Sequence, residues 1–201
     1  MALKSTVYNE ILAFYDHNVH VPTRTLYLGN IDLTNNNNDE ESEINAAFTA
    51  RAIKGLHLLD SLGAEPIKII LNGSGGDFYY AIGLVNFIQN LKSIVNIDAY
   101  GPVFSATSML LQAATGERRI SKNSRVMIHY GITTLSDYSK IVKSWSKEME
   151  KTDIEMEDLY LHRIIQKNPD FKKETLQSML NVDTILDAFD CVSLGLADCI
   201  I

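Results

Sequence analysis

The chain has 201 residues, of which 46% are hydrophobic and 21% are charged, with a formal net charge of −7. This length and composition allow one domain with a substantial core, spanning residues 1–201, and exclude a disordered chain. The negative charge argues against nucleic acid or an anionic membrane surface as the main partner.

The first quarter of the chain predicts two short elements, a loop and a helix. Residues 7–15 are predicted to form a short helix, and residues 24–29 a strand closed by glycine. The polar run 35–43 is typical of an exposed loop whose acidic residues sit at a helix N-terminus, where negative charge is favoured. A metal site in this loop is the weaker alternative, because the acids lack ligand-loop spacing. The next helix is predicted to bury one face, formed by Ile44, Phe48, Ala52, Leu56 and Leu59.

Strands and helices are predicted to alternate through the middle of the chain. Runs of β-branched residues separated by helices predict an α/β fold with a buried, largely parallel sheet. The predicted order is strand 67–71, helix 78–92, strand 95–100, turn 101–104, helix 105–114 and strand 126–129.

A long helix follows, for which Ser136 is a candidate N-cap and after which Pro169 ends the pattern. Its apolar residues recur on one side: Ile141, Trp145, Met149, Met156, Leu159 and Ile164. Because a small domain cannot cover such a helix along its whole length, we expect part of it to form a subunit interface. A short helix over residues 172–180 then leads to Asp183.

A glycine loop, Asn72-Gly73-Ser74-Gly75-Gly76, separates the first of these strands from its helix. Backbone N–H groups at a helix N-terminus are free to bind an anion, and two adjacent glycines let the backbone approach a ligand closely. The loop could equally be a simple strand–helix turn. Nucleotide binding fits poorly, because no Gly-Lys-Ser/Thr follows and the glycine spacing misses the dinucleotide fingerprint.

Three further residues carry possible chemistry, and each has a plain structural alternative. Ser105 lies at a strand-to-helix turn, where serine is more often an N-cap. His129 ends an apolar strand and Asp183 precedes another, so they could be structural and turn residues respectively. Together they supply the hydroxyl, imidazole and carboxylate of acyl transfer, with backbone N–H groups nearby to hold an oxyanion. Ser108, one turn after Ser105, is better explained as a core or capping hydroxyl.

The chain resembles the ClpP family, the proteolytic subunits of Clp protease, from about Arg24 to Asp198. The glycine loop is similar to the family's Asn-Ser-Pro-Gly-Gly loop, and Ser105 ends a Gly-x-x-x-Ser turn. Residues 123–129 match the family's histidine segment almost letter for letter, and Asp183 lies at the family's spacing before Gly195-Leu196-Ala197-Asp198. The resemblance implies a ClpP/crotonase-like stack of ββα units with a protruding helical handle, at about residues 132–166.

By this resemblance Ser105 is the nucleophile, His129 the general base and acid, and Asp183 the residue that holds the imidazole tautomer. The N–H groups of Gly76 and Ala106 are implied to form the oxyanion hole, with Gly75 in the substrate-binding loop. That loop and the segment after His129 would bracket an extended peptide through main-chain hydrogen bonds. No metal or cofactor is implied.

The resemblance also implies partners. The family forms homo-oligomeric heptameric rings, usually two stacked face to face as a tetradecamer, with the active sites inside. An AAA+ unfoldase feeds unfolded polypeptides into the chamber, so the implied activity is ATP-dependent protein degradation. The N-terminal residues around 8–25 are similar to those of shorter ClpP-like proteins of tailed phages.

The sequence departs from the family in several places. Thr107 replaces a small residue near the nucleophile, and Gly73-Ser74 replaces Ser-Pro in the loop. Asn181-Val182 replaces an acidic–arginine pair that links two rings, and residues 1–23 diverge from the family's axial hairpin. These differences leave open a catalytically impaired ring component or adaptor. An acyl-CoA enzyme of the crotonase type is a weaker alternative, because His129 and Asp183 would then be idle.

The cellular setting follows from what the chain lacks. No apolar stretch is long enough to span a membrane, and the first six residues are too polar for a signal peptide. Cys191 and Cys199 match no zinc or disulfide pattern, so two free thiols in a reducing cytoplasm are expected.

Overall fold

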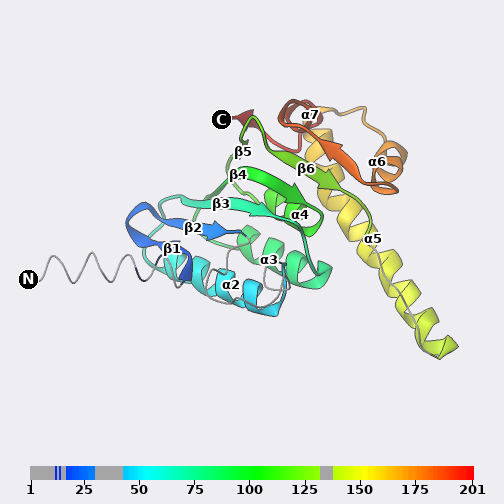
Figure 1. The fold of residues 1–201 in the computed structure, drawn as a ribbon, viewed down its shortest axis with the longest axis horizontal. Helices are drawn as coiled ribbons and strands as arrows, with labels where there is room; N and C mark the ends of the chain where they lie inside the picture. Colours follow the sequence, from blue (N-terminus) through cyan, green and yellow to red (C-terminus); the bar gives the residue numbers. More distant parts are fainter. Residues whose placement is uncertain (1–11, 13, 15–16, 30–42, 132–137) are drawn as a thin grey trace, which may run out of the picture.

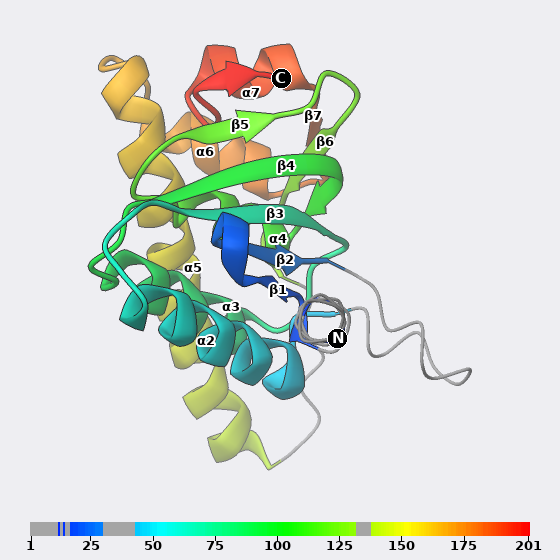
Figure 2. The same cartoon turned by 90° about the vertical axis from the view of Figure 1, so that its left-hand side faces the viewer.

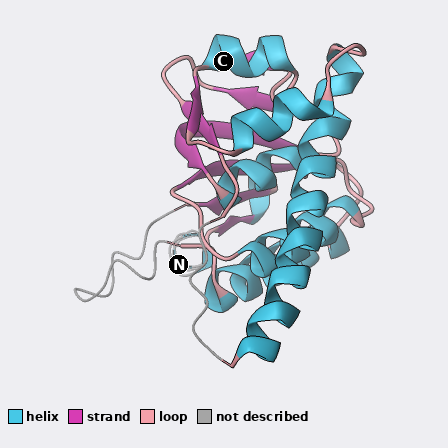
Figure 3. Ribbon diagram, turned by 90° about the vertical axis from the view of Figure 1, so that its right-hand side faces the viewer, coloured by secondary structure: helices cyan, strands magenta, loops and turns pink. Residues whose placement is uncertain are grey.

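The computed structural model of this chain describes residues 12, 14, 17–29, 43–131 and 138–201. Most of the predicted helix 7–15, the asparagine run and Ser136 lie outside these residues. The described chain has an α/β architecture, in which most of the helices lie on one side of a sheet (Figure 3).

The sheet runs β1-β2-β3-β4-β5-β8, with β6 paired to β4 and β7 paired to β6. All pairings are parallel except β1–β2 and β6–β7, so the predicted largely parallel sheet is confirmed. The strands are β1 (Val19–His20), β2 (Thr25–Leu28), β3 (Ile67–Gly73), β4 (Val95–Phe104), β5 (Arg118–Ile120), β6 (Arg125–Ile128), β7 (Thr184–Leu186) and β8 (Cys199–Ile200).

The helices connect these strands. They are the 3-10 helix η1 (Val21–Thr23) and the α-helices α2 (Ala46–Ser61), α3 (Phe78–Gln89), α4 (Ala106–Gln112), α5 (Ser139–Lys167), α6 (Lys173–Leu180) and α7 (Ala188–Leu194). The acidic residues 39–41, expected at the N-terminus of α2, lie outside the described residues, and the first turn of α2 itself holds no acidic residue. Asn45 caps it instead by accepting a hydrogen bond from the Phe48 N–H at 3.0 Å. Ile44 precedes the helix and pairs with Gly76 in an isolated β-bridge.

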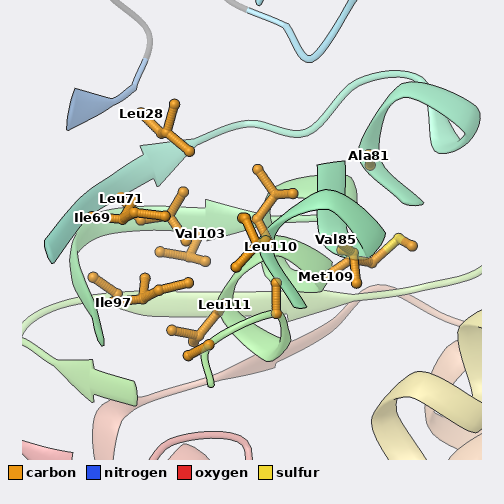
Figure 4. Close-up of a cluster of buried hydrophobic side chains, with 14 of the residues drawn as sticks. Leu28, Ile69, Leu71, Ala81, Val85, Ile97, Val103, Met109, Leu110 and Leu111 are labelled. Carbon is orange, nitrogen blue, oxygen red and sulfur yellow. The ribbon is translucent and has the colours of Figure 1, made fainter. Parts of the chain in front are cut away.

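The core lies between the sheet and helices α2, α3 and α4. Alternate residues of β3 are buried, as expected for a strand with one face on a core. Figure 4 shows strand residues such as Ile69 and Leu71 facing Val85 of α3 and Leu110 of α4. Each fully buried side chain of this size contributes about 1.5–3 kcal/mol to folding. In Figure 2, β3 and β4 lie in the middle of the sheet, so the core holds in place the strand ends that carry the glycine loop and Ser105.

Strand β4 is longer than predicted, because residues 101–104 continue the strand rather than form a turn. Its first half pairs with β5 through Ile97 and Arg118, and its second half pairs with β6 through Phe104 and Met127. Gly101 lies between the halves at φ 77°, a conformation that glycine adopts easily. Strands β5 and β8 have three and two residues, too few for a periodic signal.

Helix α5 begins at Ser139, after Tyr138 rather than after the predicted cap. Its first half projects beyond the sheet (Figure 1), and its buried residues lie only in the second half: Met156, Glu157, Tyr160 and Ile164. Trp145, predicted on the apolar face, is 49% exposed. The predicted subunit interface along this face stays a prediction. No helix within the described ranges is both apolar and long enough to cross a bilayer.

Candidate active site

The sheet brings the ends of β4, β6 and the start of β7 together. β4 and β6 are parallel, with Phe104 opposite Met127, so the residues that follow both strands emerge at the same edge. β6 and β7 are antiparallel, with Ile128 opposite Thr184. The next position in that register sets His129 opposite Asp183. Strand pairing therefore brings together three residues that are far apart in sequence. His129 lies 24 positions from Ser105 and 54 positions from Asp183.

Ser105 follows β4 directly and precedes α4. Its backbone has φ 53° and ψ −128°, a region that costs a non-glycine residue about 1–3 kcal/mol. The hydrogen bond from its N–H to the Met127 carbonyl, at 2.8 Å, holds this conformation. Ser105 occupies the N-cap position of α4, but its side chain caps no N–H. Its Oγ instead lies 2.8 Å from Nε2 of His129, so the capping interpretation is wrong.

Ser108 is structural, as the sequence indicates. Its side chain is completely buried, and its Oγ donates to the Ser105 carbonyl at 2.6 Å. It also lies 2.6 Å from the hydroxyl of Tyr160 on α5.

The imidazole of His129 bridges Ser105 and a carboxylate. Nδ1 of His129 lies 2.8 Å from Oδ1 of Asp183, so Nε2 is the ring nitrogen that faces the Ser105 hydroxyl. The His129 side chain is 17% exposed, whereas that of Asp183 is 69% exposed. The carboxylate of Asp183 is therefore open to solvent in the single chain. The hydrogen bond from the Thr184 hydroxyl to the Met179 carbonyl, at 2.7 Å, anchors the start of β7.

The glycine loop lies against both Ile44 and Ser105. Ile44 donates its N–H to the Gly75 carbonyl and accepts from the Asp77 N–H, each at 2.8 Å. This pairing leaves the Gly76 N–H without a partner among the described residues, and the same is true of the Ala106 N–H. Gly75 and Gly76 have φ values of 123° and 140°. A β-carbon on Gly75 would lie 2.7 Å from that of Ser105, so only glycine fits beside Ser105.

A buried carboxylate, which the sequence did not reveal, contacts the residue that follows His129. Glu157 on α5 is 4% exposed. It accepts a short hydrogen bond from the Tyr130 hydroxyl, one from the Gln177 amide at 3.1 Å, and an ion pair from Lys173 at 2.8 Å. These partners join the residue after His129 to α5 and α6. Tyr130 and Gln177 are 27 and 20 positions from Glu157 in sequence, so no local spacing could signal them.

This network predicts a pH dependence. Burial alone would raise the pKa of Glu157, but its bonds to Lys173, Tyr130 and Gln177 hold the pKa below its ordinary value of 4.5. The stabilisation is therefore present above about pH 4.5 and is lost as pH falls through the lower folded-state pKa. Urea unfolding at about pH 3 to 6 should show a smaller loss of stability on acidification for Glu157→Gln than for the natural chain. The slopes of the unfolding free energy against pH for the two proteins should differ by at most about 1.4 kcal/mol per pH unit.

Glu155→Gln is the matched control, because Glu155 is exposed on the same helix. Its slope should equal that of the natural chain. Equal slopes for Glu157→Gln and the natural chain would contradict the role of the buried carboxylate.

A cavity of about 380 Å³ opens beside Ser105 and His129. One wall is the glycine loop and the start of α3, with Gly76, Asp77, Phe78 and Tyr79. The opposite wall is the face of α5, with Trp145, Met149, Thr152, Asp153 and Met156. Three of the α5 residues expected at a subunit interface therefore line the site pocket.

A comparison with models of known protein families shows which family the chain belongs to. The family described as Clp protease matches residues 37–201. The chain belongs to the Clp protease family. This is a family of serine proteases, and the resemblance seen in the sequence is confirmed.

Individual relatives agree with this assignment. ATP-dependent Clp protease proteolytic subunit 2 of Treponema denticola is 29% identical over 77% of this chain and 76% of its own length. The proteolytic subunit of Deinococcus radiodurans is 28% identical over 73% and 70%. The solved structure of a point mutant of ClpP1 from Listeria monocytogenes superposes with a TM-score of 0.73 at 23% identity, covering 90% of this chain and 92% of that one. The ClpP-type α/β fold is thereby confirmed.

The departures from the family pattern leave the site geometry intact. Thr107 is buried within α4 at 2% exposure, and the Ser105 hydroxyl beside it still reaches His129. Gly73 belongs to the end of β3. Val182, beside Asp183, is 62% exposed. The divergent N-terminal segment lies mostly outside the described residues.

Proposed function

We propose that this chain is the proteolytic subunit of a Clp-type serine endopeptidase that hydrolyses peptide bonds of unfolded polypeptides. The observation that carries the proposal is the continuous Ser105–His129–Asp183 chain of hydrogen bonds, with both links at 2.8 Å. These distances favour a working triad over a catalytically impaired ring component, for which misaligned side chains are expected.

The reaction follows from this arrangement. Oγ of Ser105 attacks the peptide carbonyl carbon while Nε2 of His129 takes the hydroxyl proton. The negative oxygen of the tetrahedral intermediate accepts hydrogen bonds from the Gly76 and Ala106 N–H groups. His129 then returns the proton to the leaving amine, and the acyl–serine ester remains. A water molecule, deprotonated by His129, hydrolyses that ester and restores Ser105.

We further propose that the chain works as a homo-oligomeric, heptameric ring, in the cytoplasm, and receives substrates from an AAA+ unfoldase. The support is the family membership, the ATP-dependent designation of the relatives and the projecting first half of α5, whose exposed apolar residues Ile141 and Trp145 suit a subunit contact. A metal or cofactor is not part of the proposed mechanism.

A fluorophosphonate probe tests the nucleophile directly. The probe should label the natural chain at Ser105, should not label Ser105→Ala, and should still label Ser108→Ala, because the Ser108 hydroxyl is buried. The particle mass measured on the same sample reports the oligomeric state. Absence of labelling in an assembled ring would contradict the proposed function.

A further inference from the structure

The cavity beside the nucleophile contains a carboxylate without a counter-charge. Asp153 lines the same cavity as Ser105 and His129, and it has no hydrogen-bond or ion-pair partner among the described residues. The other acid in the lining, Asp77, is already engaged, because it caps α3 by accepting from the Tyr79 and Tyr80 N–H groups at 2.8 and 3.1 Å.

Two cations near this wall are committed elsewhere. Lys173 pairs with Glu157 at 2.8 Å, and Lys151 pairs with Glu148 at 2.7 Å. The cavity lining contains no lysine or arginine among the described residues. Residues 132–137, which follow Gly131 in sequence, lie outside the described residues and include no lysine, arginine or histidine. Burial and the charges of Glu157 and Glu150 raise the pKa of Asp153 above its ordinary value, as expected where a carboxylate lacks a cation.

The walls around Asp153 are suited to a long aliphatic stem. Asp153 stands one helical turn after Met149 and almost one turn before Met156, so the three share a face of α5. Trp145, two turns before Asp153, completes the apolar wall. Lysine and arginine bury their methylene stems on apolar surface and direct their charge to a polar partner. A cavity with apolar sides and one unpaired carboxylate fits such a side chain.

We infer that Asp153 gives this site a preference for a basic side chain on the residue that supplies the attacked carbonyl. This inference rests on the proposed function, since it names the substrate class of the same site. A lysine or arginine in the cavity would place its cation beside Asp153 and its stem against Trp145, Met149 and Met156. A neutral aliphatic residue would fill the walls but leave the carboxylate unpaired.

Two fluorogenic peptides that differ only in arginine or norleucine at that position test the inference on the assembled protein. We expect the natural chain to show a kcat/KM at least about 10-fold higher for the arginine peptide, as a hydrogen-bonded charge pair in a partly desolvated site allows. Asp153→Asn should remove this preference by lowering kcat/KM for the arginine peptide alone. Raising the salt concentration should lower kcat/KM for that peptide only.

Asp158→Asn is the matched control, because Asp158 lies on the same helix, is 67% exposed and does not line the cavity. It should keep the natural preference. Equal kcat/KM values for the two peptides, or a ratio unaffected by Asp153→Asn, would overturn the inference while leaving the proposed peptidase intact.

A binding measurement separates the inference from the proposed function. Product-like acetyl tripeptides ending in arginine or norleucine are titrated into Ser105→Ala, with and without Asp153→Asn. Tighter binding of the arginine peptide that depends on Asp153 supports the inference even if no peptide is hydrolysed. Equal binding of the two tripeptides overturns it.

Discussion

Replacing Ser105 by alanine should lower kcat for a fluorogenic peptide by about 10⁴- to 10⁶-fold, the range found when a triad nucleophile is removed. The Oγ that lies 2.8 Å from His129 Nε2 is lost, so no acyl–serine ester can form. Peptide binding should change little, because the cavity walls come from α3, α5 and the glycine loop. Single-turnover and steady-state hydrolysis by the purified oligomer measure both quantities.

Ser61→Ala is the control for this substitution. Ser61 ends α2, is exposed, and donates its hydroxyl to the Leu58 carbonyl at 2.7 Å. Its kcat should equal that of the natural chain. A Ser105→Ala protein that retains more than about a tenth of the natural kcat would show that another group is the nucleophile.

Replacing Gly76 by alanine should lower kcat by about 100- to 1000-fold, the usual cost of losing one oxyanion donor. A β-carbon at this position would lie 2.3 Å from the Ile44 nitrogen and 2.5 Å from the Ile44 oxygen, and the backbone has φ 140°. Because these contacts are with backbone atoms in a β-bridge, the loop must move and take the Gly76 N–H with it. The N–H would then no longer point at the developing negative oxygen.

Gly83→Ala on α3 is the matched control. A β-carbon there meets no atom within 4 Å, and alanine is favoured over glycine inside a helix by about 0.5–1 kcal/mol. Gly83→Ala should therefore raise the thermal midpoint slightly and leave kcat unchanged. For Gly76→Ala, thermal unfolding checks that the fold is retained. A folded Gly76→Ala with kcat within about threefold of natural would exclude its N–H from the oxyanion hole.

Local sequence was sufficient to predict the helices and strands that have a strong hydrophobic periodicity. The apolar run of β3 and the helical spacing in α2 lie where the sequence predicts them, because side-chain burial on one face leaves a regular pattern. The wrong predictions concern segments whose conformation depends on pairing with another strand. Residues 101–104 are strand only because β6 lies alongside them, and β5 and β8 exist only through their neighbours.

The chemical groups of the site are readable from the sequence alone. A serine after one strand, a histidine after a second and an aspartate before a third are local facts, and in parallel sheets such strand ends meet at one edge. The glycine pair beside them was also readable, since only glycine tolerates so close an approach of backbone to a nucleophile.

How these groups are used depends on contacts that the folded chain alone reveals. The antiparallel register of β6 and β7 brings Asp183 to His129, and a hydrogen bond to β6 holds Ser105 in its strained conformation. The isolation of Asp153 and the pairing of Glu157 depend on which cations reach α5 from elsewhere in the chain. Such long-range contacts set geometry and charge balance without leaving a local pattern, because folding joins residues whose sequence separation carries no periodic signal.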